Sequence, residues 1–149
     1  MKQSLDARRQ DPPVVQECYQ ICIAIQKLTA EFPRRQKYLL GEMLASTALE
    51  LLTGLAKACA TMDRVCKAEQ LRSVVESLLP FRLQLRMARD LSCLSEGQYV
   101  DLCMGLDRLH KQTQALIHWA ETTESSTGGG ESCRGYLQKN QTMRTLPKQ

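Results

Sequence analysis

The chain has few aromatic residues, few histidines and none of the short motifs that mark common enzymes. Aromatic side chains make up only 5% of the 149 residues, so aliphatic side chains must build the core, and this favours helices over strands. No nucleophile elbow, P-loop, dinucleotide-binding glycine motif or H-E-x-x-H zinc motif occurs. The two histidines, His110 and His118, have no evident acid or thiol partner in the sequence. We therefore expect the chain not to be an enzyme.

Closely spaced metal ligands are also missing. The seven cysteines include no C-x-x-C pair, and the E-x-x-H motif of di-metal helical bundles does not occur. Cys18 and Cys22, four residues apart, form the only pair arranged like half of a metal site. We expect most cysteines to be reduced, buried small hydrophobes, as in a reducing cytoplasm, and we expect no metal or other cofactor.

Long hydrophobic runs are absent as well. The first 13 residues are polar, and no run approaches the roughly 18 apolar residues that a membrane helix needs. These features predict a cytoplasmic protein that does not associate with a membrane.

The charge balance is mildly basic. Twenty basic and 16 acidic residues give a formal net charge of +4. This bias is compatible with a polyanionic partner, but proteins that touch no nucleic acid often carry a similar charge.

Hydrophobic periodicity predicts four helices. In the first, Val14, Cys18, Ile21, Ile25 and Leu28 recur at helical intervals, and the Phe32-Pro33 pair ends the pattern. The second spans about residues 35–60. Apolar side chains surround most of it, so it must be buried against several neighbours, supplied by the bundle itself or by another subunit.

The third and fourth helices have recognisable start signals. Asp63 is a possible N-cap for the third, in which Pro80 predicts a kink or break because it lacks an N–H. Ser95 and Gln98 form a possible capping box for the fourth, which should end near Trp119.

The predicted domain organisation has three parts. Residues 1–13 form a loose arm that ends in Pro12-Pro13, residues 14–120 form one all-α, up-down four-helix bundle, and residues 121–149 form a basic tail. The tail begins with a Thr-, Ser- and Gly-rich stretch, a composition typical of flexible linkers.

Two sequence blocks resemble a known family. The first is the run F-P-R-R-Q-K-Y-L-L-G-E over residues 32–42, and the second is L-Q-L-R-M-A-R-D-L over residues 83–91, followed by Leu94-Ser95 and Tyr99. Together they resemble the four-helix-bundle family of ribosomal-RNA intervening-sequence proteins and of the accessory variability determinants of diversity-generating retroelements. The resemblance covers about residues 14–120, and Trp119 fits the accessory variability branch. The chain departs from that branch at Ile117-His118, where the branch has two glycines, and in its additional tail.

The resemblance implies a homopentameric barrel of four-helix protomers with an electropositive surface. Members of that branch bind the reverse transcriptase of the element and nucleic acid, and they support the copying of template RNA into adenine-mutagenised complementary DNA. The accessory protein itself performs no chemistry.

The basic side chains are the candidate contacts with nucleic acid or a partner protein, because Lys and Arg neutralise phosphates. Arg82, Arg86 and Arg89 should share one helical face. The full set of candidates is Arg34, Arg35, Lys37, Lys57, Arg64, Lys67, Arg72, Arg82, Arg86 and Arg89. Each of them can instead solvate a helix or pair with a carboxylate. If so, the chain is a structural oligomer or protein adaptor of the intervening-sequence type, without nucleic-acid binding.

Overall fold

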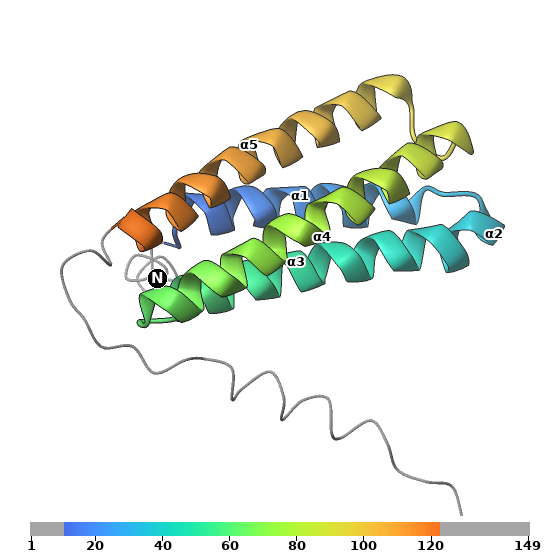
Figure 1. The fold of residues 1–149 in the computed structure, drawn as a ribbon. Helices are drawn as coiled ribbons and strands as arrows, with labels where there is room; N and C mark the ends of the chain where they lie inside the picture. Colours follow the sequence, from blue (N-terminus) through green and yellow to red (C-terminus); the bar gives the residue numbers. More distant parts are fainter. Residues whose placement is uncertain (1–10, 123–149) are drawn as a thin grey trace, which may run out of the picture.

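The computed structural model describes residues 11–122, which form four long antiparallel helical rods joined by short loops (Figure 1). The first rod is α1, Pro13–Ala30. The second consists of α2, Arg34–Gln36, a π-helical turn η2, Lys37–Gly41, and α3, Glu42–Ala60. The third is α4, Arg64–Asp90, and the fourth is α5, Glu96–Thr122. The predicted all-α four-helix bundle is therefore confirmed.

The predicted start signals act as expected. The backbone N–H of Cys66 donates to Asp63 Oδ2 at 3.0 Å, so Asp63 caps α4. At the start of α5 the backbone N–H of Ser95 donates to Gln98 Oε1 at 2.9 Å, and that of Gln98 donates to Ser95 Oγ at 3.2 Å. This reciprocal pair is a capping box.

Each helix packs against two neighbours, so that the four rods form a closed ring in the order α1, α3, α4, α5. Small residues allow two of these contacts to be close. A Cβ added to Gly54 of α3 would lie 3.1 Å from Val74 Cγ2 of α4. A Cβ added to Gly105 of α5 would lie 3.3 Å from Ile21 Cγ1 of α1.

The core is aliphatic, as the shortage of aromatic residues predicts. Phe81 is its largest fully buried side chain, and most of the others are leucines. Thr113 is fully buried, and its hydroxyl donates to the carbonyl of Leu109 at 2.8 Å. The fully buried leucines are Leu44, Leu55, Leu71, Leu85, Leu106 and Leu109.

Of the kink or break expected at Pro80, the break does not occur, because α4 continues through Pro80 to Asp90. Pro80 lies on the exposed side of the helix, whereas Leu78 and Phe81 on either side of it are buried. The carbonyl that loses its donor belongs to exposed Glu76, where water can replace the missing hydrogen bond. Packing of the flanking side chains therefore outweighs the local preference of proline.

The helix bounds lie within three residues of those expected, since the second rod begins at Arg34 and the fourth helix ends at Thr122. The π-helical turn in the second rod was not predicted. The expected arm of residues 1–13 and tail of residues 121–149 lie almost wholly outside the described residues.

The expectation that no stretch has the length and composition of a membrane helix is wrong for the second rod. Residues 34–60 contain an 18-residue window of mean hydropathy 1.3, so this helix meets the length and composition of a membrane span, although 33% of the window is buried within the bundle. The core side chains Leu44, Leu51 and Leu55 lie on one face of this rod, between α1 and α4. The core helix of a bundle passes the same composition test.

Candidate nucleic-acid interface

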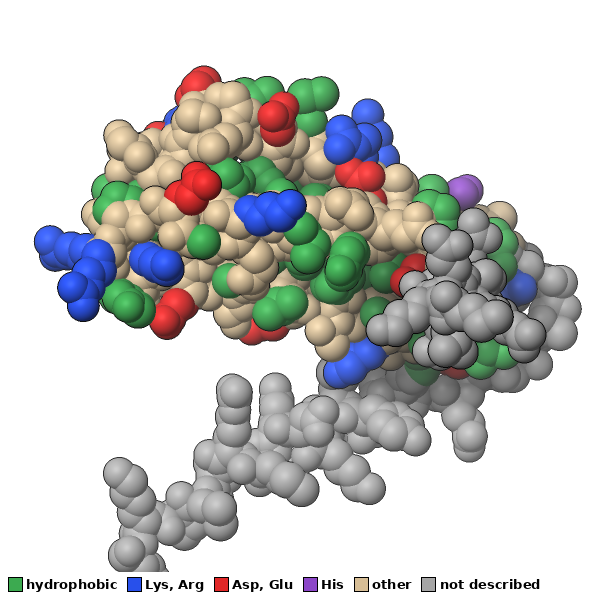
Figure 2. Space-filling model, turned by 180° about the vertical axis from the view of Figure 1, so that it is seen from behind, with side chains coloured by type: hydrophobic (Ala, Val, Ile, Leu, Met, Phe, Trp, Pro, Cys, Tyr) green, Lys and Arg blue, Asp and Glu red, His purple; other side chains and the backbone are tan. Residues whose placement is uncertain are grey.

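The ten predicted basic residues do not form one patch. Arg34, Arg35 and Lys37 lie at the tip where the second rod begins, which we call the α2 tip. Figure 2 shows basic side chains gathered at this tip of the bundle. Lys57, Arg64 and Lys67 lie around the loop that joins α3 to α4, which we call the α3–α4 tip. The 19 residues of α3 separate the two tips by roughly 28 Å.

The other four candidates lie along α4, and each has a carboxylate partner. Arg72 pairs with Glu121 and Arg82 with Asp107, both across to α5. Arg89 Nη2 lies 2.8 Å from Asp90 Oδ1, and Arg86 Nε lies 4.0 Å from Asp90 Oδ2.

Arg82 and Arg89 of the predicted shared face thus lie on the side of α4 that meets α5, whereas Arg86 is exposed and forms its ion pair with Asp90 of the same helix. The Arg89 guanidinium also lies 4.5 Å from the centroid of the Tyr99 ring on α5. Hydrogen bonding by Arg82 holds the pKa of Asp107 below its ordinary value. The Asp90 carboxylate similarly raises the pKa of Arg89. Arg82 and Arg89 therefore connect two helices, and their charges are largely balanced within the chain.

The six basic residues at the two tips differ from the four arginines farther along α4. None of them forms an ion pair with another residue of the described range 11–122. Lys37 Nζ donates to the carbonyl of Ala30 at 3.1 Å and so closes the end of α1. Arg34 and Arg35 are exposed, so the α2 tip presents two guanidinium groups to solvent.

The α3–α4 tip also contains an aromatic side chain, Trp119, which is not among the candidate residues predicted from the sequence. The Arg64 guanidinium carbon lies 4.8 Å from the centroid of the Trp119 ring, and Lys67 Nζ lies 5.8 Å from it. Both distances are within the range of cation–π attraction. Trp119 is still 50% exposed. The sequence signal available for this cluster was a single tryptophan in an aromatic-poor chain.

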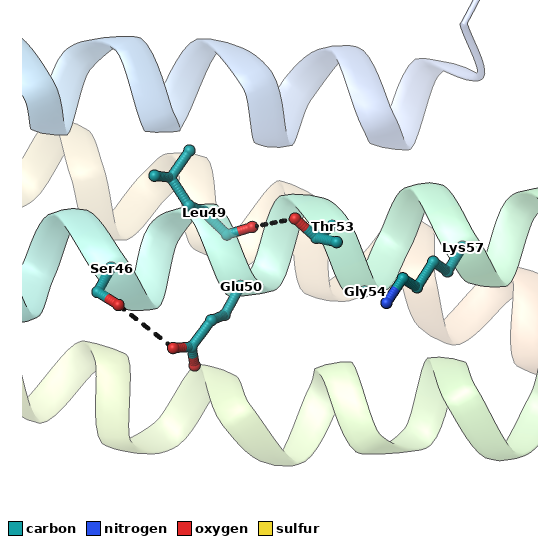
Figure 3. A pocket seen from close by; sticks show the side chains of 6 residues that line it. All are labelled: Ser46, Leu49, Glu50, Thr53, Gly54 and Lys57. Atoms are coloured by element: carbon teal, nitrogen blue, oxygen red, sulfur yellow. Dashed lines mark hydrogen bonds between the residues drawn. The ribbon is translucent and has the colours of Figure 1, made fainter. Parts of the chain in front are cut away.

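A shallow hollow lies on the outer side of α3, next to the α3–α4 tip (Figure 3). Its volume is about 380 Å³. Within it the Ser46 hydroxyl donates to Glu50 Oε1 at 3.3 Å and the Thr53 hydroxyl to the carbonyl of Leu49 at 2.8 Å. The ammonium of Lys57 lies at one end of the hollow and adds a cation to this side of the tip. All of its lining residues come from one helix, so it is an open depression rather than an enclosed site.

Large apolar side chains are exposed on several helices. On the second rod Leu39 is 66% exposed and Leu49 is 49% exposed, so the bundle covers only one side of this helix. Leu79, Leu83 and Met87 follow one another at four-residue intervals on the outer side of α4 and are also exposed. Figure 2 shows further apolar side chains on the face made by α1 and α3. Exposed apolar surface of this kind is typical of protein interfaces.

The cysteines are not arranged as a metal site in the described part of the chain. No group of three or more His, Cys, Asp or Glu residues within residues 11–122 is placed to hold a metal ion. Cys18 and Cys22 are buried free thiols, and Cys22 Sγ donates to the carbonyl of Ala48 at 3.0 Å. Hydrogen bonding with Cys22 and burial raise the pKa of the Cys18 thiol. Cys59, Cys93 and Cys103 are also free but only half-buried, so they fit the predicted buried class less well.

Comparison of the sequence with protein-family models and with curated proteins finds no match to either.

Proposed function

We propose that this chain is a non-catalytic accessory protein of a diversity-generating retroelement. In this proposal it binds the template RNA or its complementary DNA, together with the reverse transcriptase of the element, and so supports mutagenic reverse transcription in the cytoplasm. The proposal rests on the resemblance of residues 14–120 to the accessory variability determinants. The helical-bundle fold is compatible with that resemblance.

The observation that carries nucleic-acid binding is the contrast between the two classes of basic residue. Arg72, Arg82, Arg86 and Arg89 are balanced by carboxylates of α4 and α5, whereas the cations at the two tips, which include Arg64 and Lys67 at the start of α4, have no such partner among residues 11–122. A cation that has no ion-pair partner is available to a phosphate without first breaking an internal ion pair. Arg34, Arg35 and Lys57 are exposed, and Arg64 and Lys67 are half-buried beside Trp119. Phosphate contacts release counterions and give affinity that depends little on sequence.

We therefore place nucleic-acid binding at the tips rather than along α4. Arg34 and Arg35 form one contact and Lys57, Arg64 and Lys67 the other. A strand that touches both tips must cross roughly 28 Å, the length of α3. Arg82 and Arg89 act mainly in holding α4 against α5.

The exposed apolar side chains favour assembly as well. In the proposal the open side of the second rod packs against another copy of the chain, in the pentameric barrel that the resemblance implies. Burial of one large aliphatic side chain in such an interface contributes about 1.5–3 kcal/mol.

A second function is supported by the apolar series on α4. Leu79, Leu83 and Met87 form an exposed apolar surface next to arginines that are already paired. This surface suits a protein partner better than a phosphate backbone. In the alternative, the chain is a structural oligomer or adaptor of the intervening-sequence type, and it does not bind nucleic acid.

A binding measurement at two salt concentrations separates the two functions. A fluorescently labelled single-stranded RNA of mixed sequence is titrated with the protein at about 50 mM and 200 mM salt, and the assembly state is measured by light scattering. The accessory-protein proposal predicts binding that weakens steeply with salt, because counterion release drives it. The adaptor alternative predicts no binding even at the lower salt concentration.

A further inference from the structure

The α3–α4 tip combines an exposed aromatic ring with cations that have no ion-pair partner among the described residues. We propose that Trp119, Arg64 and Lys67 form a stacking site for an unpaired nucleobase, in which Trp119 contacts the base and the two cations contact the flanking phosphates. This inference rests on the proposed function, because it specifies how one part of the surface binds nucleic acid. It also makes single-stranded rather than duplex nucleic acid the ligand at this site.

Geometry supports a role for the ring in binding. Half of the Trp119 side chain remains in contact with solvent, although two cations already lie within 6 Å of its centroid. The two cations lie beside the ring, and about half of the residue's surface remains exposed to solvent. Sequence-tolerant single-strand binding proteins combine an aromatic surface with a positive groove in this manner.

The charges around the ring are suitable for a phosphate backbone. Arg64 and Lys67 are one helical turn apart at the start of α4, so both project from the same side of the helix. The nearest carboxylate in the sequence, that of Asp63, accepts the hydrogen bond from the N–H of Cys66 that caps this helix. Lys57 from the end of α3 adds a third cation to the tip.

The chain offers a matched aromatic control. Tyr19 of α1 is 51% exposed, almost the same as Trp119, but no cation lies over its ring within the described residues. If any exposed aromatic side chain supports binding, Tyr19→Ala and Trp119→Ala should have equal effects. If the cationic setting matters, only the tryptophan substitution should weaken binding.

The test exploits the single tryptophan of the sequence, whose fluorescence reports directly on this site. The full chain is titrated at low salt with three 12-nucleotide oligomers: oligo-uridylate, oligo-thymidylate and an abasic deoxyribose-phosphate chain of the same length. Stacking of a base on Trp119 should quench the fluorescence with the first two oligomers but not with the abasic chain. Equal quenching by the uridylate and thymidylate oligomers indicates recognition of base and phosphate alone, whereas stronger binding of the uridylate indicates an added contact with the ribose hydroxyl.

Substitutions then separate the base contact from the phosphate contacts, with binding followed through a label on the oligomer. Trp119→Ala should weaken thymidylate binding about fivefold or more and leave the abasic chain unaffected, because one stacked base contributes about that factor or more. Trp119→Phe should restore most of the loss. Arg64→Ala with Lys67→Ala should weaken all three oligomers, and Tyr19→Ala should weaken none. Circular dichroism and light scattering should show unchanged helicity and assembly for each variant.

Two results overturn the inference and are distinct from failure of the proposed function. If the wild-type chain binds all three oligomers and Trp119→Ala changes nothing, the stacking site is refuted while nucleic-acid binding stands. If Trp119→Ala weakens the abasic chain as much as the thymidylate, the ring serves only to position the cations. Absence of wild-type binding to any oligomer at low salt refutes both the site and the function on which it rests.

Discussion

Replacing Pro80 by alanine should stabilise the bundle, although proline replacements in a folded protein are often harmful. Pro80 lies in the interior of the 27-residue helix α4, with an exposed side chain. Alanine would restore a backbone N–H that can donate to the carbonyl of Glu76, four residues earlier, and would remove the clash of the ring with that carbonyl.

The size of the effect follows from opposing contributions. In a helix interior, proline is about 3 kcal/mol less favourable than alanine. Part of this penalty is avoided here, because Glu76 and Pro80 are both exposed and water can hydrogen-bond the Glu76 carbonyl. We therefore expect Pro80→Ala to raise the free energy of unfolding by about 1–2 kcal/mol.

Urea denaturation followed by circular dichroism measures this change. Pro80→Gly provides the control, because glycine restores the same N–H but is about 1 kcal/mol less favourable than alanine in a helix. We expect the Pro80→Ala variant to be the most stable, and the wild type to be less stable than the Pro80→Gly variant or equal to it. A Pro80→Ala variant that is less stable than the wild type would refute the reasoning, since it would mean that the bundle requires the local geometry imposed by proline.

Three further perturbations test other parts of the structure. Asp63→Ala removes the cap of α4 and should lower the free energy of unfolding by about 1 kcal/mol, whereas Asp63→Asn keeps a capping oxygen and should lower it much less. Equal losses of stability in the two variants would contradict a capping role. Ser92, in the α4–α5 loop, has a φ of 57°, a left-handed conformation that glycine adopts more easily than serine. Ser92→Gly should therefore raise the free energy of unfolding by roughly 0.5–1 kcal/mol, and a lower melting temperature would contradict this. Because Arg82 depresses the pKa of Asp107, the ion pair should stabilise the fold above the ordinary carboxyl pKa, and this contribution should be lost as the pH falls through the depressed value. The stability difference between wild type and Asp107→Asn should accordingly shrink below about pH 4, and a difference independent of pH would show that charge is not its cause.

Much of the fold was predictable from local patterns. The helical spacing of apolar residues located all four rods, and the capping signals at Asp63 and Ser95 located two helix starts. These features act within a few residues of one another, so a sequence displays them directly. The break considered at Pro80 does not occur, because the local preference of proline for ending a helix is outweighed by burial of Leu78 and Phe81, which depends on the other helices. The π-helical turn at Lys37–Gly41 was missed because no simple residue pattern specifies it.

The candidate site was predictable only as a set of residue types. The sequence indicated which residues are basic and placed Arg82, Arg86 and Arg89 on one face of a helix. It did not reveal that Arg82 and Arg89 face α5, because their partners on that helix, Asp107 and Glu96, come near them only when α4 and α5 pack together. Similarly, Trp119 is more than 50 positions from Arg64 and Lys67 in the sequence, and only the antiparallel packing of α4 and α5 brings them together.

The most direct test of the central claim compares two variants that lose the same number of positive charges. One replaces Arg34, Arg35, Arg64 and Lys67 at the tips by alanine, and the other replaces Arg72, Arg82, Arg86 and Arg89 along α4. The affinity for single-stranded RNA is measured as a function of salt for both variants and for the wild type, with assembly state checked in parallel. If all four tip residues contact phosphates, the tip variant should lose about 3 units of the slope of log affinity against log salt, while the α4 variant retains the wild-type slope. A wild-type slope in the tip variant, combined with a loss in the α4 variant, would contradict the account.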